Sequence, residues 1–237
     1  MSFNIILITI IFISAIYMLP LLSLHFRNDK NLIITYYFII TLYQIIAFTN
    51  AFWFRTIGAD MDANSFHVLA IEISKGGEFV FHSGASLYKH ILGLLYWLTE
   101  PSLIIGEQFS ILLISISIIF FVKIIDLFKL NLYQIPLVIC YAGLPTMIIL
   151  GAITLREPLE ICLLIIAVYF SFKVMLYTKG KAINFALMTL FCLAMALLHR
   201  ALFVFVPFLI FLTFVCDFNK TSSIFVMSKR RALLALF

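Results

Sequence analysis

Residues Phe3–Leu24 read FNIILITIIFISAIYMLPLLSL, and this run carries no charged side chain. About 20 mostly apolar residues are enough for one helix to cross the hydrocarbon core of a bilayer. Similar runs recur along the chain, so the sequence predicts an all-α fold, a polytopic transmembrane helical bundle of about seven spans. The expected spans are Phe3–Leu24, Leu32–Phe54, Gly106–Val122, Leu132–Ile153, Pro158–Tyr177, Ile183–Leu198 and Ala201–Val215.

The whole chain has the composition of a protein whose solvent is lipid. Of its 237 residues, 64% are hydrophobic and 11% are charged, and the mean hydropathy is +1.16. A soluble domain is typically about 45–50% apolar and about 25% charged. The formal net charge of +5 comes mainly from short links between apolar runs and does not indicate nucleic acid. We therefore expect the lipid bilayer, and no nucleic acid, as a partner.

The positions of lysine and arginine predict how the chain sits in the membrane. Links rich in these residues stay on the cytoplasmic side, which places the N-terminus outside and the C-terminus inside a cytoplasmic (inner) membrane. This alternation requires that the short apolar piece Ser86–Leu98 does not cross, so we expect an interfacial helix there. The resulting divisions are an extra first span with its cytoplasmic link at 1–31, a membrane core at 32–218 with an external loop at 55–105, and a basic cytoplasmic tail at 219–237.

The sequence leaves open whether 183–215 is a hairpin of two helices or one long helix. The stretch 183–215 contains His199-Arg200 but no Gly or Pro at that corner. A single helix over this stretch would be about 50 Å long, which is too long for one crossing. We predict a hairpin and keep one long helix as the alternative.

An acidic turn, Gly58-Ala59-Asp60-Met61-Asp62, opens the long external loop. Two carboxylates on one turn can share a divalent cation such as Mg or Mn, or one of them can serve as a general base. The other interpretation is structural, with Asp62 capping a helix and Asp60 solvated in the loop. The residues that follow fit an amphipathic helix on the bilayer surface, with an apolar face of Phe66, Leu69, Ala70 and Ile73.

Basic residues occur at three further places on the same predicted side of the membrane. Arg156 opens the stretch Arg156-Glu157-Pro158-Leu159-Glu160. This stretch suits a helix start, where Pro158 fits the first turn and the two glutamates lie beside the positive helix end. His199-Arg200 interrupts an apolar stretch, and Lys89-His90 lies in the expected interfacial helix. A guanidinium at the membrane edge can face an anionic phosphate. Each group also has a plain interpretation, as a helix start, a topological anchor or a lysine that reaches the headgroups.

Taken together, these segments resemble the membrane core of the GT-C superfamily, the polytopic glycosyltransferases that use polyprenyl-phosphate sugars. The resemblance covers roughly Leu32–Val215 and is architectural more than literal. It implies that Asp60 or Asp62 is catalytic or binds a metal. It also implies that Arg156, His199 and Arg200, with Lys89 and His90, bind the carrier phosphate. The partners would be a polyprenyl-phosphate-linked sugar and a glycan acceptor, in the assembly of a cell-surface polysaccharide or glycan. Members of that superfamily are usually longer, so we expect this chain to be a truncated or minimal member.

Two other functions remain open. The stretch Arg55-Thr56-Ile57-Gly58-Ala59-Asp60 is similar to one found in Wzy/EpsG-type O-antigen or exopolysaccharide polymerases, whereas the second acid, Asp62, favours the GT-C interpretation. A non-enzymatic transporter or accessory subunit is a third class. It would place charges along a path through the membrane midplane.

Overall fold

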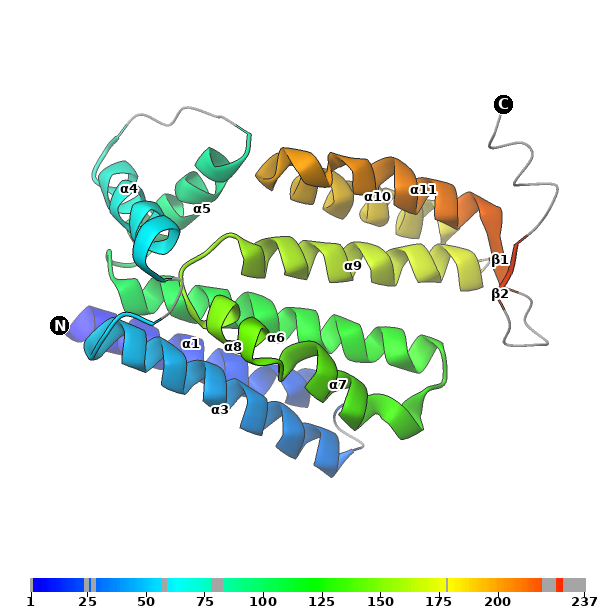
Figure 1. The fold of residues 1–237 in the computed structure, drawn as a ribbon, viewed down its shortest axis with the longest axis horizontal. Helices are drawn as coiled ribbons and strands as arrows, with labels where there is room; N and C mark the ends of the chain where they lie inside the picture. Colours follow the sequence, from blue (N-terminus) through cyan, green and yellow to red (C-terminus); the bar gives the residue numbers. More distant parts are fainter. Residues whose placement is uncertain are drawn as a thin grey trace.

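The computed structural model describes residues 2–23, 26, 29–56, 59–77, 83–177, 179–218 and 225–227. Figure 1 shows long helices that run side by side, with the shorter helices labelled α4 and α5 gathered at one end of the bundle. The strands found in these ranges are β1 (Cys216–Phe218) and β2 (Phe225–Met227), which pair antiparallel. Apart from β2, the predicted basic tail at 219–237 lies outside the described residues, as does Arg27 of the first link.

Within the described ranges, five helices are long and apolar enough to cross a membrane. These are α1 (Phe3–Leu22), α3 (Lys30–Phe52), α6 (Leu103–Leu127), α9 (Glu157–Leu176) and α10 (Lys181–Leu198). Large apolar side chains point outward from them, so that Phe38 of α3 is 65% exposed. An outward apolar surface on long helices is what a lipid environment favours. The chain is thus a helical membrane protein, and five of the predicted spans are helices. Four have nearly the predicted bounds, whereas α6 extends beyond the predicted Gly106–Val122 at both ends.

The predicted span Leu132–Ile153 is instead two helices with a 60° bend between them. The 3-10 turn η2 (Asn131–Tyr133) leads into α7 (Gln134–Ala142), and α8 follows at Pro145–Ala152. Pro145 has no N–H for the helix and its ring forces the preceding residue, Leu144, into an extended conformation with φ −64° and ψ 135°. If this bent pair counts as one span, the total is six. The seventh predicted span, discussed next, is shorter.

The stretch 183–215 forms a hairpin, as predicted. Helix α10 stops at Leu198, and His199 is extended with φ −145° and ψ 107°. The chain then continues as the 3-10 helix η3 (Arg200–Val204) and as α11 (Phe205–Val215). Helix α11 packs back against α9 and α10, and Figure 1 shows it running beside α10. One long helix is excluded.

Three elements of the long loop cover one end of the bundle. They are the π-helical turn η1 (Ala59–Ala63), α4 (Asn64–Ser74) and α5 (Ala85–Leu98). The apolar face of α4 packs on α5, where the rings of Phe66 and Tyr88 lie 5.1 Å apart, rather than facing outward as a bilayer-surface helix would. The approach is close at Gly93, where a Cβ would meet Ile73 Cγ2 at 2.7 Å. The two helices are therefore one packed unit.

Different helix ends lie at the two ends of the bundle. At the end that carries α4 and α5, Asn4 near the start of α1 donates to Glu100 Oε1 at 2.8 Å. The start of α9 and the end of α10 lie at this same end (Figure 1). We refer to it as the α5 end, and to the opposite end, where α6 and α9 finish, as the Lys123 end.

Polar side chains join the central helix α6 to α3. Gln44 and Gln108 are buried and exchange two amide hydrogen bonds, of 2.9 and 2.7 Å. Tyr43 donates to the carbonyl of Ala142 at 2.9 Å. In an apolar solvent such bonds and close packing hold helices together, because burial of apolar surface contributes little. They set the relative rotation of the helices that present the candidate site.

Candidate functional site

Charged side chains from two helix ends meet at the α5 end. Arg156 Nε lies 3.5 Å from Glu160 Oε1 and 3.8 Å from Glu157 Oε1. On the other side of Glu160, its Oε2 lies 3.6 Å from His199 Nδ1. We name these four residues the charged corner. The distances exceed those of good hydrogen bonds, so the groups form a loose cluster and not a closed network.

The local sequence explains the first half of this corner. Helix α9 begins at Glu157, with Pro158 in its first turn and two acids there. The N–H that proline lacks would have no partner within the helix at that position, so proline is well tolerated there. Carboxylates are favoured beside the positive end of a helix. The predicted helix start is therefore confirmed, and Arg156 directly precedes it at the α5 end.

Arg200 joins a third segment to the same end. Its Nε donates to Ser83 Oγ at 3.2 Å, and one turn earlier the carbonyl of Leu197 accepts from the N–H of Gly84 at 2.6 Å. These two bonds attach the residues just before α5 to the end of α10. Gly84 has a φ of +96°, which residues with a side chain rarely adopt, so the glycine permits this connection.

An apolar cavity opens beside Arg200. Its volume is about 380 Å³, and its walls come from Ser83, Leu193, Ala196, Leu197, Arg200 and Phe203. All of these side chains are apolar except the serine and the arginine. A cavity of this composition can take a hydrocarbon chain along its walls and an anion at its single charged group.

A fully buried carboxyl group lies inside the same end of the bundle. Glu107, the fifth residue of α6, has no exposed surface. Its Oε1 accepts a hydrogen bond from Asn50 of α3, and its Oε2 has no partner among the described residues. Asn50 in turn accepts from the backbone N–H of Thr56 at 3.0 Å. This group of three residues anchors the loop that starts at Arg55 to the bundle.

Our sequence reasoning missed Glu107, although the signal was present. It is the only acid in the first half of the apolar run Leu103–Leu127, and ionisable residues inside spans are rare and functional more often than not. Glu107 follows the helix start by four residues, or about 6 Å. It therefore belongs to the α5 end and not to a path through the middle of the membrane.

A partly buried polar pair joins α4 to α5: His67 Nδ1 lies 2.7 Å from the Tyr96 hydroxyl. Burial lowers the pKa of His67 below its ordinary value of 6.5, and the positive charge of Arg55 lowers it further. Burial raises the pKa of Tyr96. The neutral forms of both side chains are thus favoured in the folded protein.

The His67 pair gives a testable pH dependence. Because the pKa of His67 is lower in the folded than in the unfolded chain, the unfolded chain binds more protons between the two values, and stability rises with pH there. The stability that depends on a neutral His67 is fully present above pH 6.5 and is lost as the pH falls through the pKa of His67 in the folded protein. We expect the melting temperature in detergent to drop on acidification from about pH 8 to 5, and to drop less in His67→Gln. An equal drop in both proteins would contradict the assignment.

Gly106 sits where α6, α5 and the segment after α8 approach one another. A Cβ there would lie 2.7 Å from the Tyr96 hydroxyl and 2.8 Å from Thr154 Oγ1. Both neighbours are buried, so neither can move away cheaply. We expect Gly106→Ala to destabilise the protein by about 1–3 kcal/mol, measured by unfolding in detergent. Ala186→Leu, at an exposed position of α10, is the control and should have little effect; equal stability of the two variants would contradict this close contact.

The other predicted site residues are placed as follows. Asp62 is exposed within η1, so the helical turn begins before it and Asp62 does not cap α4. The side chain of Asp60 lies outside what the structure describes. Lys89 is partly exposed on α5, whereas His90 is buried with its Nδ1 2.8 Å from the Ser86 carbonyl of its own helix.

The structure thus brings Arg156 and His199 into one cluster and places Arg200 directly after it. Lys89 and His90 belong to the helix that begins beside Arg200. No group of three or more His, Cys, Asp and Glu side chains suited to a metal occurs among the described residues. Comparisons with protein-family models, with curated protein sequences and with solved structures gave no match to this chain.

Proposed function

We propose that the protein is a glycosyltransferase-like membrane enzyme that binds a polyprenyl-phosphate sugar at its α5 end. One observation carries this proposal: Arg200 lines a cavity whose other lining side chains, apart from Ser83, are apolar and come mostly from α10. A polyprenyl phosphate has this same division, with one anionic group at the end of a long hydrocarbon chain. A bare phosphate would not need the apolar walls, and a plain lipid tail would not need the guanidinium.

The balance of charge favours Arg200 over Arg156 as the main phosphate ligand. Arg156 lies near two carboxylates, those of Glu157 and Glu160, which compensate its charge. Arg200 donates to the neutral hydroxyl of Ser83 and its residue is exposed. A guanidinium keeps further N–H donors for a phosphate after it has made one hydrogen bond. In this proposal Arg156 and His199 are positioning residues, held by Glu160 beside the end of α10 that leads to Arg200.

The chemistry then follows from the acidic turn. A carboxylate of Asp60 or Asp62 takes the proton from a hydroxyl of the glycan acceptor. The acceptor oxygen forms a bond to C1 of the sugar as the bond between C1 and the carrier phosphate oxygen breaks, and polyprenyl phosphate leaves with that electron pair. Arg200 stabilises the negative charge that grows on the phosphate. Lys89, on the helix that begins beside Arg200, adds positive charge to the same edge.

A divalent cation is not needed for this sequence of steps. Asp62 is an exposed carboxylate on a short turn, and the residues described around it do not provide a three-ligand set. If Mg or Mn binds, Asp60 and Asp62 are the side chains that would hold it, and it would supply charge neutralisation at the phosphate.

The proposed orientation places the α5 end outside a cytoplasmic membrane. The Lys123 end carries five lysines, which lie in the last turns of α6 and α9, in the links that follow these helices and at the first residue of α10: Lys123, Lys129, Lys173, Lys179 and Lys181. Positive residues of this kind favour the cytoplasmic side, which supports an external α5 end and an external N-terminus.

A polymerase of the Wzy/EpsG type is the second candidate. Its support is the Arg55–Asp60 stretch, whose first two residues are held by hydrogen bonds: Arg55 donates to Asn64 Oδ1 at 3.0 Å, and the Thr56 N–H donates to Asn50 Oδ1 at 3.0 Å. Asp62→Asn separates the candidates. Loss of sugar transfer from a single-sugar donor favours the glycosyltransferase, and unchanged chain extension favours the polymerase.

The direct test is transfer of radiolabelled sugar from a series of polyprenyl-phosphate donors. Membranes that contain the protein are compared with membranes that lack it. The expected result is incorporation into a glycan that depends on the protein and on one of the donors. No protein-dependent incorporation with any single-sugar or oligosaccharide donor would overturn the proposal.

A further inference from the structure

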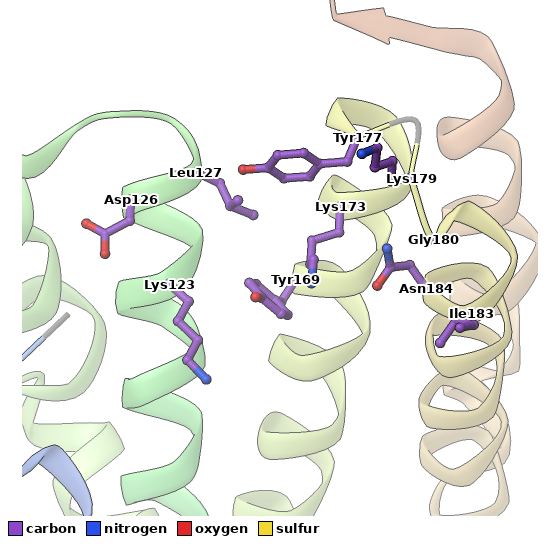
Figure 2. A pocket seen from close by; sticks show the side chains of 10 residues that line it. All are labelled: Lys123, Asp126, Leu127, Tyr169, Lys173, Tyr177, Lys179, Gly180, Ile183 and Asn184. Atoms are coloured by element: carbon purple, nitrogen blue, oxygen red, sulfur yellow. The ribbon is translucent and has the colours of Figure 1, made fainter. Parts of the chain in front are cut away.

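A second cavity lies at the Lys123 end, far from the proposed sugar-transfer site. Its volume is about 710 Å³, and it lies between the end of α6, the end of α9 and the start of α10. Figure 2 shows lysines from all three places around it: Lys123, Lys173 and Lys179. These three lysines meet because α9 packs against both α6 and α10.

Two of these lysines are held in place by an aromatic ring. The Nζ of Lys173 lies 5.5 Å from the centre of the Tyr169 ring, and the Nζ of Lys123 lies 6.0 Å from the same centre. Lys123 also lies 4.5 Å from the centre of Phe120. A ring face attracts an ammonium group within about 6 Å. The two positive charges are therefore kept near each other although they repel, and an anion between them would relieve the repulsion.

The polar groups around the lysines point to an anionic ligand. Asn184 is 7% exposed and lines the cavity (Figure 2), and none of the side-chain hydrogen bonds found among the described residues involves its amide. Asp126 also lines the cavity, but Gln134 donates to its carboxylate, and in Figure 2 this carboxylate points away from α9. Three lysines against one aspartate leave an excess of two positive charges (3 − 1) in the lining.

The start of α10 adds backbone donors. Gly180 precedes this helix and provides no side-chain cap, so the first N–H groups of α10 lie unbonded within their own helix. Such groups bind anions well. They lie at the edge of the cavity, since Gly180 and Ile183 are both part of its lining.

We propose that this cavity binds the phosphate of an anionic lipid headgroup. The phosphate would be held by Lys123, Lys173 and the Asn184 amide. A lipid fits better than a soluble phosphate because the rim is apolar and exposed: Ile183 is 69% and Tyr177 48% exposed. Basic pockets between membrane helices on the cytoplasmic side bind such headgroups, and anionic lipids are abundant in that leaflet.

The test uses the full chain in detergent and native mass spectrometry or equilibrium binding. The ligands are short-chain phosphatidylglycerol, short-chain phosphatidylcholine and inorganic phosphate. We expect tight binding of phosphatidylglycerol only, weakened about fivefold for each lysine removed, so the double variant Lys123→Gln/Lys173→Gln should lose about 25-fold. The matched control is Lys75→Gln, an exposed lysine after α4, which should leave binding unchanged.

Each of three results would overturn the proposal. Inorganic phosphate binding as tightly as phosphatidylglycerol would make the site one for a soluble anion. An equal loss in Lys75→Gln would mean that net charge alone attracts the lipid. If the double variant does not fold, Lys179→Gln replaces it, since this lysine is exposed. Unchanged binding in Lys179→Gln, together with wild-type binding that does not fall with added salt, would equally contradict the proposal.

Discussion

Replacing the aspartate that serves as the general base, by Asp60→Asn or by Asp62→Asn, should lower sugar transfer by about 100-fold or more, because a general base contributes about 10²–10⁴-fold to a proton transfer. Asparagine has nearly the shape of aspartate but cannot take the proton of the acceptor hydroxyl. Asp62 is exposed in η1, so its replacement should leave the packing of α4 on α5 intact. The measurement is the rate of transfer from a polyprenyl-phosphate donor in membranes with equal amounts of each protein.

The matched control for this experiment is Glu72→Gln. Glu72 is a carboxylate on α4, in the same unit as Asp62 but almost three turns away, and it should retain activity. If only one aspartate matters, that residue is the base and the other belongs to the turn. Equal transfer by the wild type and both variants would show that the carboxylates are turn residues, and the accessory or transport function would then be the better interpretation.

Arg200→Ala should weaken binding of the polyprenyl-phosphate carrier by about 10- to 100-fold. A hydrogen bond between ionised groups is worth about 1.5–3 kcal/mol, and a guanidinium can make two of them to one phosphate. The alanine also removes one wall of the 380 Å³ cavity, but leaves its apolar residues Leu193 and Phe203. Arg200→Lys should bind at an intermediate level, since it keeps the charge and loses the planar fork. Binding of a radiolabelled carrier phosphate to the purified protein measures both changes.

Lys75→Ala is the control, because Lys75 is another exposed basic residue and follows α4, outside the proposed site. It should bind the carrier as the wild type does. Normal carrier binding by Arg200→Ala would remove Arg200 from the site. A loss of the same size in both variants would mean that the carrier responds to positive charge in general and not to the cavity beside α10.

A large part of the fold follows from local sequence. An apolar run of about 20 residues becomes a spanning helix in almost any surroundings, because lipid leaves its backbone groups no partners except one another. This is why α1, α3 and α9 appear with nearly the predicted bounds. Alternation of the spans also explains why Arg156 and His199, 43 residues apart by number (199 − 156), meet at one end.

The break at Pro145 and the packing of α4 were not predicted, although both have signals in the sequence. Leu144-Pro145 is a common helix boundary, but its apolar surroundings suggested one continuous span. The apolar face of α4 was assigned to the bilayer surface, because one helix pattern cannot distinguish a lipid partner from a protein partner. The structure supplies α5 as that partner.

The sequence by itself determined a helical membrane protein, most of its helices, and the gathering of its basic corners at one end. Only the tertiary structure decided which side chains meet: Glu107 with Asn50, Arg200 with Ser83 at 117 residues' separation, and Lys123 with Lys173 around Tyr169. The physical reason lies in the solvent. Lipid is as apolar as leucine, so apolar residues can surround a spanning helix and do not reveal its buried face. The rotation and neighbours of each helix are set by interhelical packing and a few polar contacts.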